Sequence, residues 1–130
     1  LSTDIRKFEN LGTRSFPTEM AAGHAVNFHQ TIGGERKQKR LFYLKNYWLE
    51  KVLELGNVST LTSLKPEYSG ALANFLVAGM KPGELGSELF KRARIHTTSI
   101  EWENISGVRV TPHVYTTLKD LDRLVATVQQ

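Results

Sequence analysis

The sequence predicts an α+β domain in which a small antiparallel sheet carries helices packed on one face. Two observations support this. Apolar residues recur at helical spacing in the first half and in the last segment, and segments rich in β-branched residues lie between them. Short turns join these strand-like segments, and short turns are typical of antiparallel pairs. The expected order is helix, helix, strand, strand, helix, strand, strand, helix.

The first helix is expected to begin at Pro17, because proline suits the first turn, where its missing N–H has no partner in any case. Ser15 or Phe16 would cap it, and it should end near Ile32, before two glycines. Its apolar residues are Met20, Ala21, Val26 and Phe28.

A second helix is expected over residues 34–55, ended by Gly56-Asn57. The side of this helix away from its apolar stripe carries the run ERKQKR, residues 35–40, which holds much of the net charge of +4. Acidic residues share that side, and mixed charge is typical of a solvated face, whereas a nucleic-acid helix is more uniformly basic. We therefore expect no nucleic-acid partner. The apolar stripe consists of Leu41, Leu44, Trp48, Val52 and Leu55.

Strands are expected at residues 58–64, 70–78, 95–102 and 108–110. A helix beginning at residues 81–83 separates the second strand from the third and uses Leu85, Leu89 and Phe90. A polar turn at residues 103–107 joins the last two strands. Thr117 should cap the last helix, with Asp120 three residues on. The stripe of that helix is Leu118, Leu121, Val125 and Val128.

The 130 residues suit one domain, and the absence of cysteine excludes disulfides and thiolate metal sites. No apolar run approaches the roughly 20 residues of a membrane span, so no membrane partner is expected. The absence of cysteine fits a reducing compartment, and a cytoplasmic location is expected. His24 and His29 diverge on their helix and have no carboxylate cluster nearby, so no metal site is expected. Because there is no initiating methionine, Leu1 is expected to be an internal residue.

Arg109 stands between Val108 and Val110, and alternate residues of a strand point to opposite faces of a sheet. If the valines face the helices, Arg109 lies on the uncovered face. That face would be solvated in an isolated domain and could line a cleft in a larger enzyme.

Three segments carry a resemblance: FENLGTRSFP, YSGALANFLVAGM and VRVTPHVYTTLKDLDRLV. In this order they resemble the C-terminal part of class V aminotransferase-like enzymes, which use pyridoxal phosphate and have the fold-type I architecture. The isopenicillin N epimerase-like branch, related to cysteine desulfurases, is the most similar. The resemblance implies a remnant of the large domain at residues 1–16 and the C-terminal small domain at residues 17–130.

The same resemblance implies the roles of three residues. Gly12 and Thr13 would contact the cofactor phosphate of the other subunit of a homodimer, because phosphate prefers N–H and O–H donors near a helix start. Arg109 would bind the α-carboxylate of an amino-acid substrate, because a planar guanidinium suits bidentate carboxylate binding. The family's Schiff-base lysine would lie upstream of this chain, so the fragment alone is expected to be inactive.

The type of reaction stays open between epimerisation, transamination and elimination. The alternative is a freestanding α+β interaction domain that uses the basic helix or the open sheet face.

Overall fold

The computed structural model describes residues 3–9 and 12–130 of the chain. The chain divides into two compact units, residues 1–34 and residues 35–130, each described here by itself.

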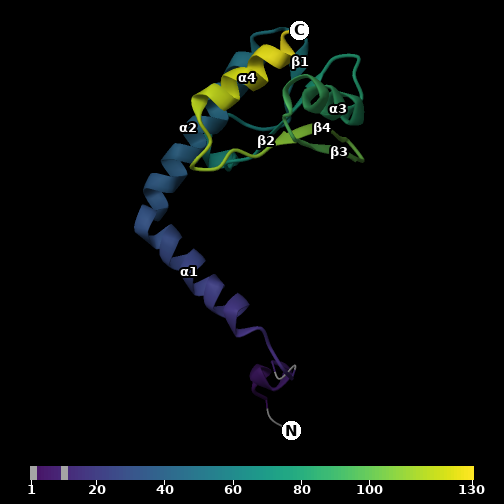
Figure 1. Ribbon diagram of the computed structural model, residues 1–130. Helices are drawn as coiled ribbons and strands as arrows, with labels where there is room; N and C mark the ends of the chain where they lie inside the picture. Colours follow the sequence, from purple (N-terminus) through teal and green to yellow (C-terminus); the bar gives the residue numbers. More distant parts are fainter. Residues whose placement is uncertain (1–2, 10–11) are drawn as a thin grey trace. The chain divides into compact units, whose positions relative to one another are not determined.

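The first unit contains a short 3-10 helix, Ile5–Phe8, and the helix α1, Phe16–Ile32 (Figure 1). Ser15 is the N-cap of α1 and Pro17 lies in its first turn, as predicted. The Ser15 hydroxyl does not cap the backbone and instead lies 2.9 Å from the hydroxyl of Thr18. No residue of α1 is buried within this chain, so its apolar residues find no core here.

The second unit is a four-stranded antiparallel sheet with the strand order β1-β2-β4-β3. In Figure 1 the helix α3 lies over the sheet and α4 runs beside α2. The bounds of the elements are α2 Gly34–Leu53, β1 Val58–Ser59, a 3-10 turn Pro66–Tyr68, β2 Ala73–Val77, α3 Pro82–Ala93, β3 Thr98–Trp102, β4 Ile105–Val110 and α4 Leu118–Val128.

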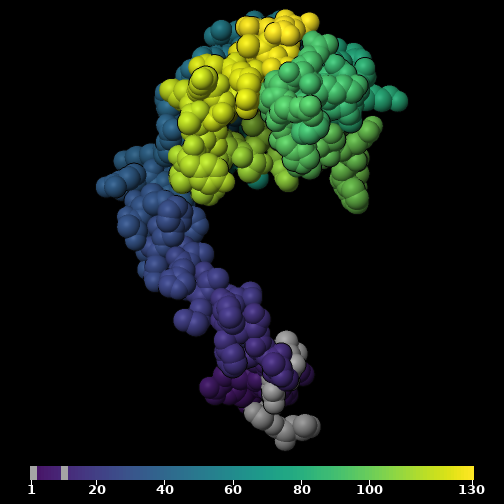
Figure 2. All heavy atoms as spheres, in the orientation of Figure 1, coloured from purple at the N-terminus to yellow at the C-terminus, as the bar shows by residue number. Residues whose placement is uncertain are grey.

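One apolar cluster joins the three helices of this unit to one face of the sheet. Trp48 of α2 packs edge-to-face on Phe75 of β2, with ring centroids 5.6 Å apart. Leu85 and Leu89 of α3 are buried in the same cluster, as is Leu121 of α4. In the space-filling view the atoms of α3 and α4 lie in contact (Figure 2). The predicted α+β class, with helices on one face of a small antiparallel sheet, is confirmed.

The predicted order of elements is confirmed, but several strand boundaries were wrong. The first strand ends at Ser59 rather than at residue 64, because the backbone N–H of Leu61 donates to the side chain of Asn74 and not to a ladder partner. The second begins at Ala73 rather than at residue 70, and the third at Thr98 rather than at residue 95.

The predicted polar turn at residues 103–107 was also too long. Glu103 adopts a positive φ of 49°, which permits a two-residue turn, so β4 already begins at Ile105. Phe90 was expected in the core of α3 but is 44% exposed.

The start of α4 is a complete capping box, as predicted. The Thr117 hydroxyl accepts from the Asp120 backbone N–H, and the Asp120 carboxylate accepts from the Thr117 backbone N–H. These bonds satisfy donors that a helix start leaves unpaired. The Thr117 hydroxyl also donates to the Asp120 carboxylate at 2.6 Å, and this bond, followed by the bond from the Thr117 backbone N–H, lowers the pKa of Asp120.

A polar contact joins α4 to α2. The carboxylate of Asp122 accepts from the Tyr47 hydroxyl and from Lys51 Nζ, both at 2.8 Å. Lys51 Nζ also lies 3.8 Å from the centre of the Tyr47 ring. The bond to Lys51, and then the bond to Tyr47, lowers the pKa of Asp122.

Candidate functional site

Arg109 lies on the face of the sheet opposite the helices, as the strand alternation predicted. Its neighbours Val108 and Val110 are buried in the core, whereas Arg109 is exposed. Asn74 of β2 and Thr98 of β3 are its cross-strand partners, so all three share the same face. We call this the open face; it also carries Ile100 and Ile105.

A shallow pocket of about 240 Å³ lies beside Arg109 on the open face. Five of its eight lining residues are aliphatic, and Arg109 is the only charged residue among them. The lining residues are Leu61, Thr62, Leu72, Ala73, Asn74, Ile100, Ile105 and Arg109.

The guanidinium of Arg109 has one modest contact. Its Nη2 donates to the Thr98 hydroxyl at 3.4 Å, which is long for a charged donor. Within residues 3–9 and 12–130, Arg109 forms no ion pair with a carboxylate. An exposed guanidinium of this kind can take a carboxylate in a two-pronged contact.

Residues 60–62 form one wall of the pocket, and Asn74 holds them in place. Asn74 Oδ1 accepts from the Leu61 backbone N–H at 3.1 Å and from the Thr62 hydroxyl at 3.2 Å. The Asn74 backbone completes the contact, since its N–H donates to Thr62 Oγ1 at 3.0 Å and its carbonyl accepts from Thr60 Oγ1 at 2.7 Å. Sequence reasoning missed this role. The available signal was one polar residue in the apolar run GALANFLV.

Gly107 allows the backbones of β2 and β4 to approach next to this site. Its φ is 143°, and a Cβ atom added there would lie 2.7 Å from the carbonyl oxygen of Phe75 and 3.3 Å from Asn74 Nδ2. Glycine is therefore required at this position.

Gly12 and Thr13 belong to the first unit, so the site predictions fall in separate units. Gly12 has a left-handed φ of 79°, which favours glycine, and both residues are exposed just before α1. The donors and the positive end of the helix dipole suit an anion such as phosphate. Arg14, beside them, is paired with Glu19 at 3.2 Å.

Lys45 is the one buried lysine in the described part of the chain, and its burial was not predicted from the sequence. Its Nζ donates to the Ser63 carbonyl at 3.0 Å and to the Ser69 hydroxyl. Burial lowers the pKa of Lys45, and the charge of Glu50 opposes this shift. These bonds tie the segment after β1 to α2, so the amine serves packing.

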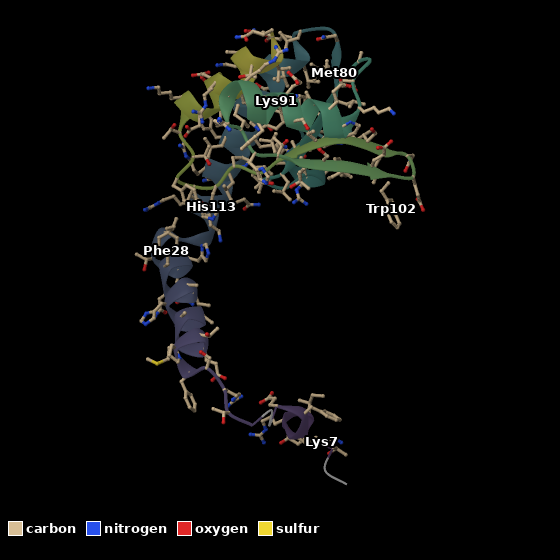
Figure 3. The ribbon with its side chains drawn as sticks, turned by 45° about the vertical axis from the view of Figure 1, so that its right-hand side comes forward. Lys7, Phe28, Met80, Lys91, Trp102 and His113 are labelled. Atoms are coloured by element: carbon tan, nitrogen blue, oxygen red, sulfur yellow. The ribbon has the colours of Figure 1, made fainter. Side chains whose placement is uncertain are left out.

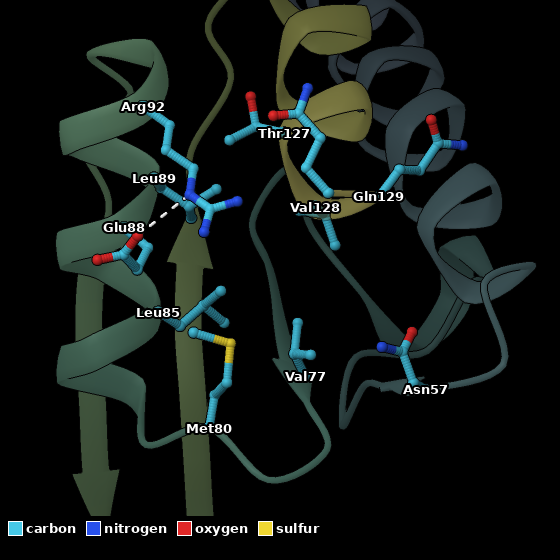
Figure 4. Close-up of a pocket in the computed structure, with 11 residues that line it drawn as sticks. Asn57, Val77, Met80, Leu85, Glu88, Leu89, Arg92, Thr127, Val128 and Gln129 are labelled. Atoms are coloured by element: carbon cyan, nitrogen blue, oxygen red, sulfur yellow. Dashed lines mark hydrogen bonds and ion pairs between the residues drawn. The ribbon is translucent and has the colours of Figure 1, made fainter.

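A second pocket of about 300 Å³ lies between α3, α4 and the end of β2 (Figure 4). Its floor includes Val77, Leu85 and Leu89. Its charged groups are engaged with one another, since Arg92 Nε lies 3.1 Å from a carboxylate oxygen of Glu88. The arginine of this pocket is thus already paired with a carboxylate, in contrast to Arg109.

The described residues contain no group of three or more His, Cys, Asp or Glu side chains that could hold a metal ion. None of the helices they form is long and apolar enough to cross a bilayer.

Two curated proteins are similar to this chain in sequence. Isopenicillin N epimerase of Amycolatopsis lactamdurans is 28% identical over 131 residues, which cover 99% of this chain and 33% of that protein. Isopenicillin N epimerase of Streptomyces clavuligerus is 26% identical over 121 residues, 92% of this chain and 30% of that protein. The chain thus spans about a third of the length of these relatives. No protein-family model matches it.

Solved structures share its fold. A cysteine desulfurase from Thermococcus onnurineus NA1, solved in the apo state, has a TM-score of 0.71 at 20% identity, covering 80% of this chain and 28% of that one. The cystine C–S lyase C-DES, solved with its reaction product cysteine persulfide, has a TM-score of 0.67 at 18% identity, covering 82% of this chain and 27% of that one. The resemblance recognised in the sequence is confirmed: the chain is similar in sequence to part of two isopenicillin N epimerases and shares its fold with part of a cysteine desulfurase and of a cystine C–S lyase.

Proposed function

We propose that this chain is the C-terminal part of a pyridoxal phosphate-dependent enzyme that acts on an amino acid, and that its task is to bind the substrate carboxylate through Arg109. The observation that carries the proposal is the position of Arg109. The guanidinium stands on the open face, beside an apolar pocket and without an ion pair among the described residues.

The chemistry of this site suits the recognition of a carboxylate. A charged hydrogen bond contributes about 1.5–3 kcal/mol. A second prong adds orientation as well as affinity. By holding the carboxylate, Arg109 would fix which bond at the α-carbon faces the reactive group, which is a positioning contribution to catalysis.

The residues present fit the phosphate part of the cofactor. Gly12 would offer a backbone N–H and Thr13 a hydroxyl, ahead of the N-terminus of α1. In the proposed homodimer this loop serves the cofactor phosphate of the partner subunit. Pyridoxal phosphate, when bound, supplies the electron sink for reactions at the α-carbon.

The lysine that holds the cofactor is proposed to lie outside this chain, and residues 1–16 are proposed to close the large domain. The buried Lys45 is fully enclosed, and its amine donates to the Ser63 carbonyl and the Ser69 hydroxyl, so it is not accessible to the carbonyl group of a cofactor. Epimerisation, transamination and elimination all remain compatible with the residues of this chain.

Peptide mapping tests the proposal. The longer enzyme and the 130-residue chain are each incubated with pyridoxal phosphate, dialysed, reduced with borohydride and digested. We expect the longer enzyme to carry the label on one lysine outside this chain, and the chain alone to carry none in stoichiometric amount. Stoichiometric labelling of one lysine within the chain would overturn the placement of the cofactor site.

A further inference from the structure

We propose that Asn74 is a positioning residue for Arg109. It fixes residues 60–62 beside the guanidinium and, because its amide is neutral, leaves the guanidinium unpaired for the carboxylate of a ligand. The ligand half of this inference rests on the role proposed above for Arg109.

The first step concerns the hydrogen bonds of Asn74. The side chain is only 9% exposed, although it lies on the open face. Its Oδ1 holds the Leu61 N–H and the Thr62 hydroxyl, and its Nδ2 donates to the Ser106 carbonyl at 3.4 Å. The sheet has no ladder partner for Leu61 here, because β1 ends at Ser59. Hydrogen bonds to Asn74 therefore hold residues 60–62 where the ladder of the sheet no longer does.

The second step concerns what the segment does. Leu61 and Thr62 line the pocket from the side of residues 60–62, while Ile100 and Ile105 line it from the β3–β4 hairpin. Without the first wall, Arg109 would stand on a flat, open sheet. By holding Leu61 and Thr62 in place, Asn74 keeps an apolar pocket beside the guanidinium of Arg109.

The third step concerns charge. Asn74 and Arg109 are directly opposed on neighbouring strands, and side chains so placed interact. An aspartate at position 74 could accept the same two hydrogen bonds from Leu61 and Thr62, but it would also place a carboxylate next to the guanidinium. The Asn74 amide accepts these hydrogen bonds without placing a negative charge next to Arg109.

The walls define the ligand class. The aliphatic side chains near Arg109 suit a small carboxylate with an uncharged aliphatic body. A second carboxylate on the ligand would find no cation other than Arg109 among the pocket-lining residues.

The anchoring half is tested by amide hydrogen exchange on the ¹⁵N-labelled 130-residue chain. In Asn74→Ala the Leu61 amide should exchange at least about fivefold faster, relative to the Val108 amide in the core of the sheet. Should Asn74→Ala fail to fold, Thr62→Val removes one partner of Asn74 more gently and should give the same direction. Thr97→Val is the control, because the buried Thr97 hydroxyl has no hydrogen-bond partner among the described residues. Unchanged Leu61 exchange in these variants overturns the anchoring role.

The charge half is tested by titration with isobutyrate, using isobutyramide as the uncharged control and following the Arg109 Nε–H signal. The unmodified chain should show a saturable shift with isobutyrate only. Asn74→Asp should keep Leu61 protected, displace the Arg109 signal without ligand, and weaken isobutyrate binding at least about tenfold. Binding by Asn74→Asp as tight as by the unmodified chain overturns this half.

The two proposals fail separately. Absence of isobutyrate binding to the unmodified chain overturns the carboxylate role of Arg109, and with it the ligand half of this inference. The exchange data would still decide whether Asn74 anchors residues 60–62.

Discussion

Asn74 of β2 and Arg109 of β4 are cross-strand neighbours on the same face of the sheet, yet their side chains form hydrogen bonds with different partners. The Asn74 amide oxygen serves Leu61 and Thr62, whereas Arg109 Nη2 reaches the Thr98 hydroxyl. The side chain of Asn74 is thus occupied by structural hydrogen bonds, whereas the guanidinium of Arg109 is available to bind a ligand. This division of tasks is the basis of the site proposed here.

Gly107→Ala tests the close approach of β2 and β4. The added Cβ would lie 2.7 Å from the Phe75 carbonyl oxygen, which is backbone and cannot turn away. We expect the free energy of unfolding to fall by about 2 kcal/mol or more, measured by urea denaturation. Gly83→Ala on α3 is the control, because a Cβ there meets nothing within 4 Å, and it should be neutral or stabilising. Equal stability of the two variants would refute the packing argument.

The contact of Asp122 with α2 should make stability depend on pH. Hydrogen bonds from Lys51 and Tyr47 hold the folded-state pKa of Asp122 below its ordinary value of 3.8. The stabilisation is therefore complete above that value and disappears as the pH falls through the lower, folded-state pKa. Asp122→Asn should be less stable than the unmodified chain near neutral pH, and the difference should vanish in acid.

Urea denaturation across the acid range measures this difference. Glu67→Gln is the control for a simple loss of charge, because Glu67 is exposed and forms no ion pair within the described residues. A stability difference for Asp122→Asn that stays constant from neutral pH into acid would contradict the assignment.

Thr13→Ala tests the proposed phosphate contact. Thr13 is exposed, so the fold should be unaffected, whereas the longer enzyme should retain its cofactor less well. Loss of one charge-assisted hydrogen bond predicts about a tenfold to hundredfold weaker affinity. Equilibrium dialysis against pyridoxal phosphate measures it, with Thr18→Ala as a neighbouring control. The same affinity in both variants would reduce Gly12-Thr13 to an ordinary turn.

Local patterns predicted much of the fold. Helical periodicity located α2, because Leu44, Trp48 and Val52 are all buried on one side. The capping residues placed the start of α4 correctly, since Thr117 and Asp120 act over three residues. Alternation along β4 placed Arg109 on the correct face, because it depends only on the neighbouring valines.

Features that depend on distant residues were not predictable in this way. The end of β1 depends on Asn74, which lies fourteen residues after Thr60. The Thr60 hydroxyl donates to the Asn74 carbonyl, and the Leu61 N–H donates to the Asn74 side chain. The burial of Lys45 depends on acceptors in the segment at Ser63 and Ser69. Trp102 is the opposite case: tryptophan is usually well buried, but this side chain projects from the end of the β3–β4 hairpin and is 68% exposed (Figure 3).

The most direct test of the central claim is steady-state kinetics of Arg109→Lys in the longer enzyme, with an amino acid and with its decarboxylated amine as substrates. Arg92→Lys is the matched control, because Arg92 lies on α3 and is paired with Glu88. An ammonium keeps the charge but cannot form the two-pronged contact. If Arg109 binds the carboxylate, kcat/KM for the amino acid should fall at least about tenfold more than kcat/KM for the amine. Equal losses for the two substrates would contradict the claim.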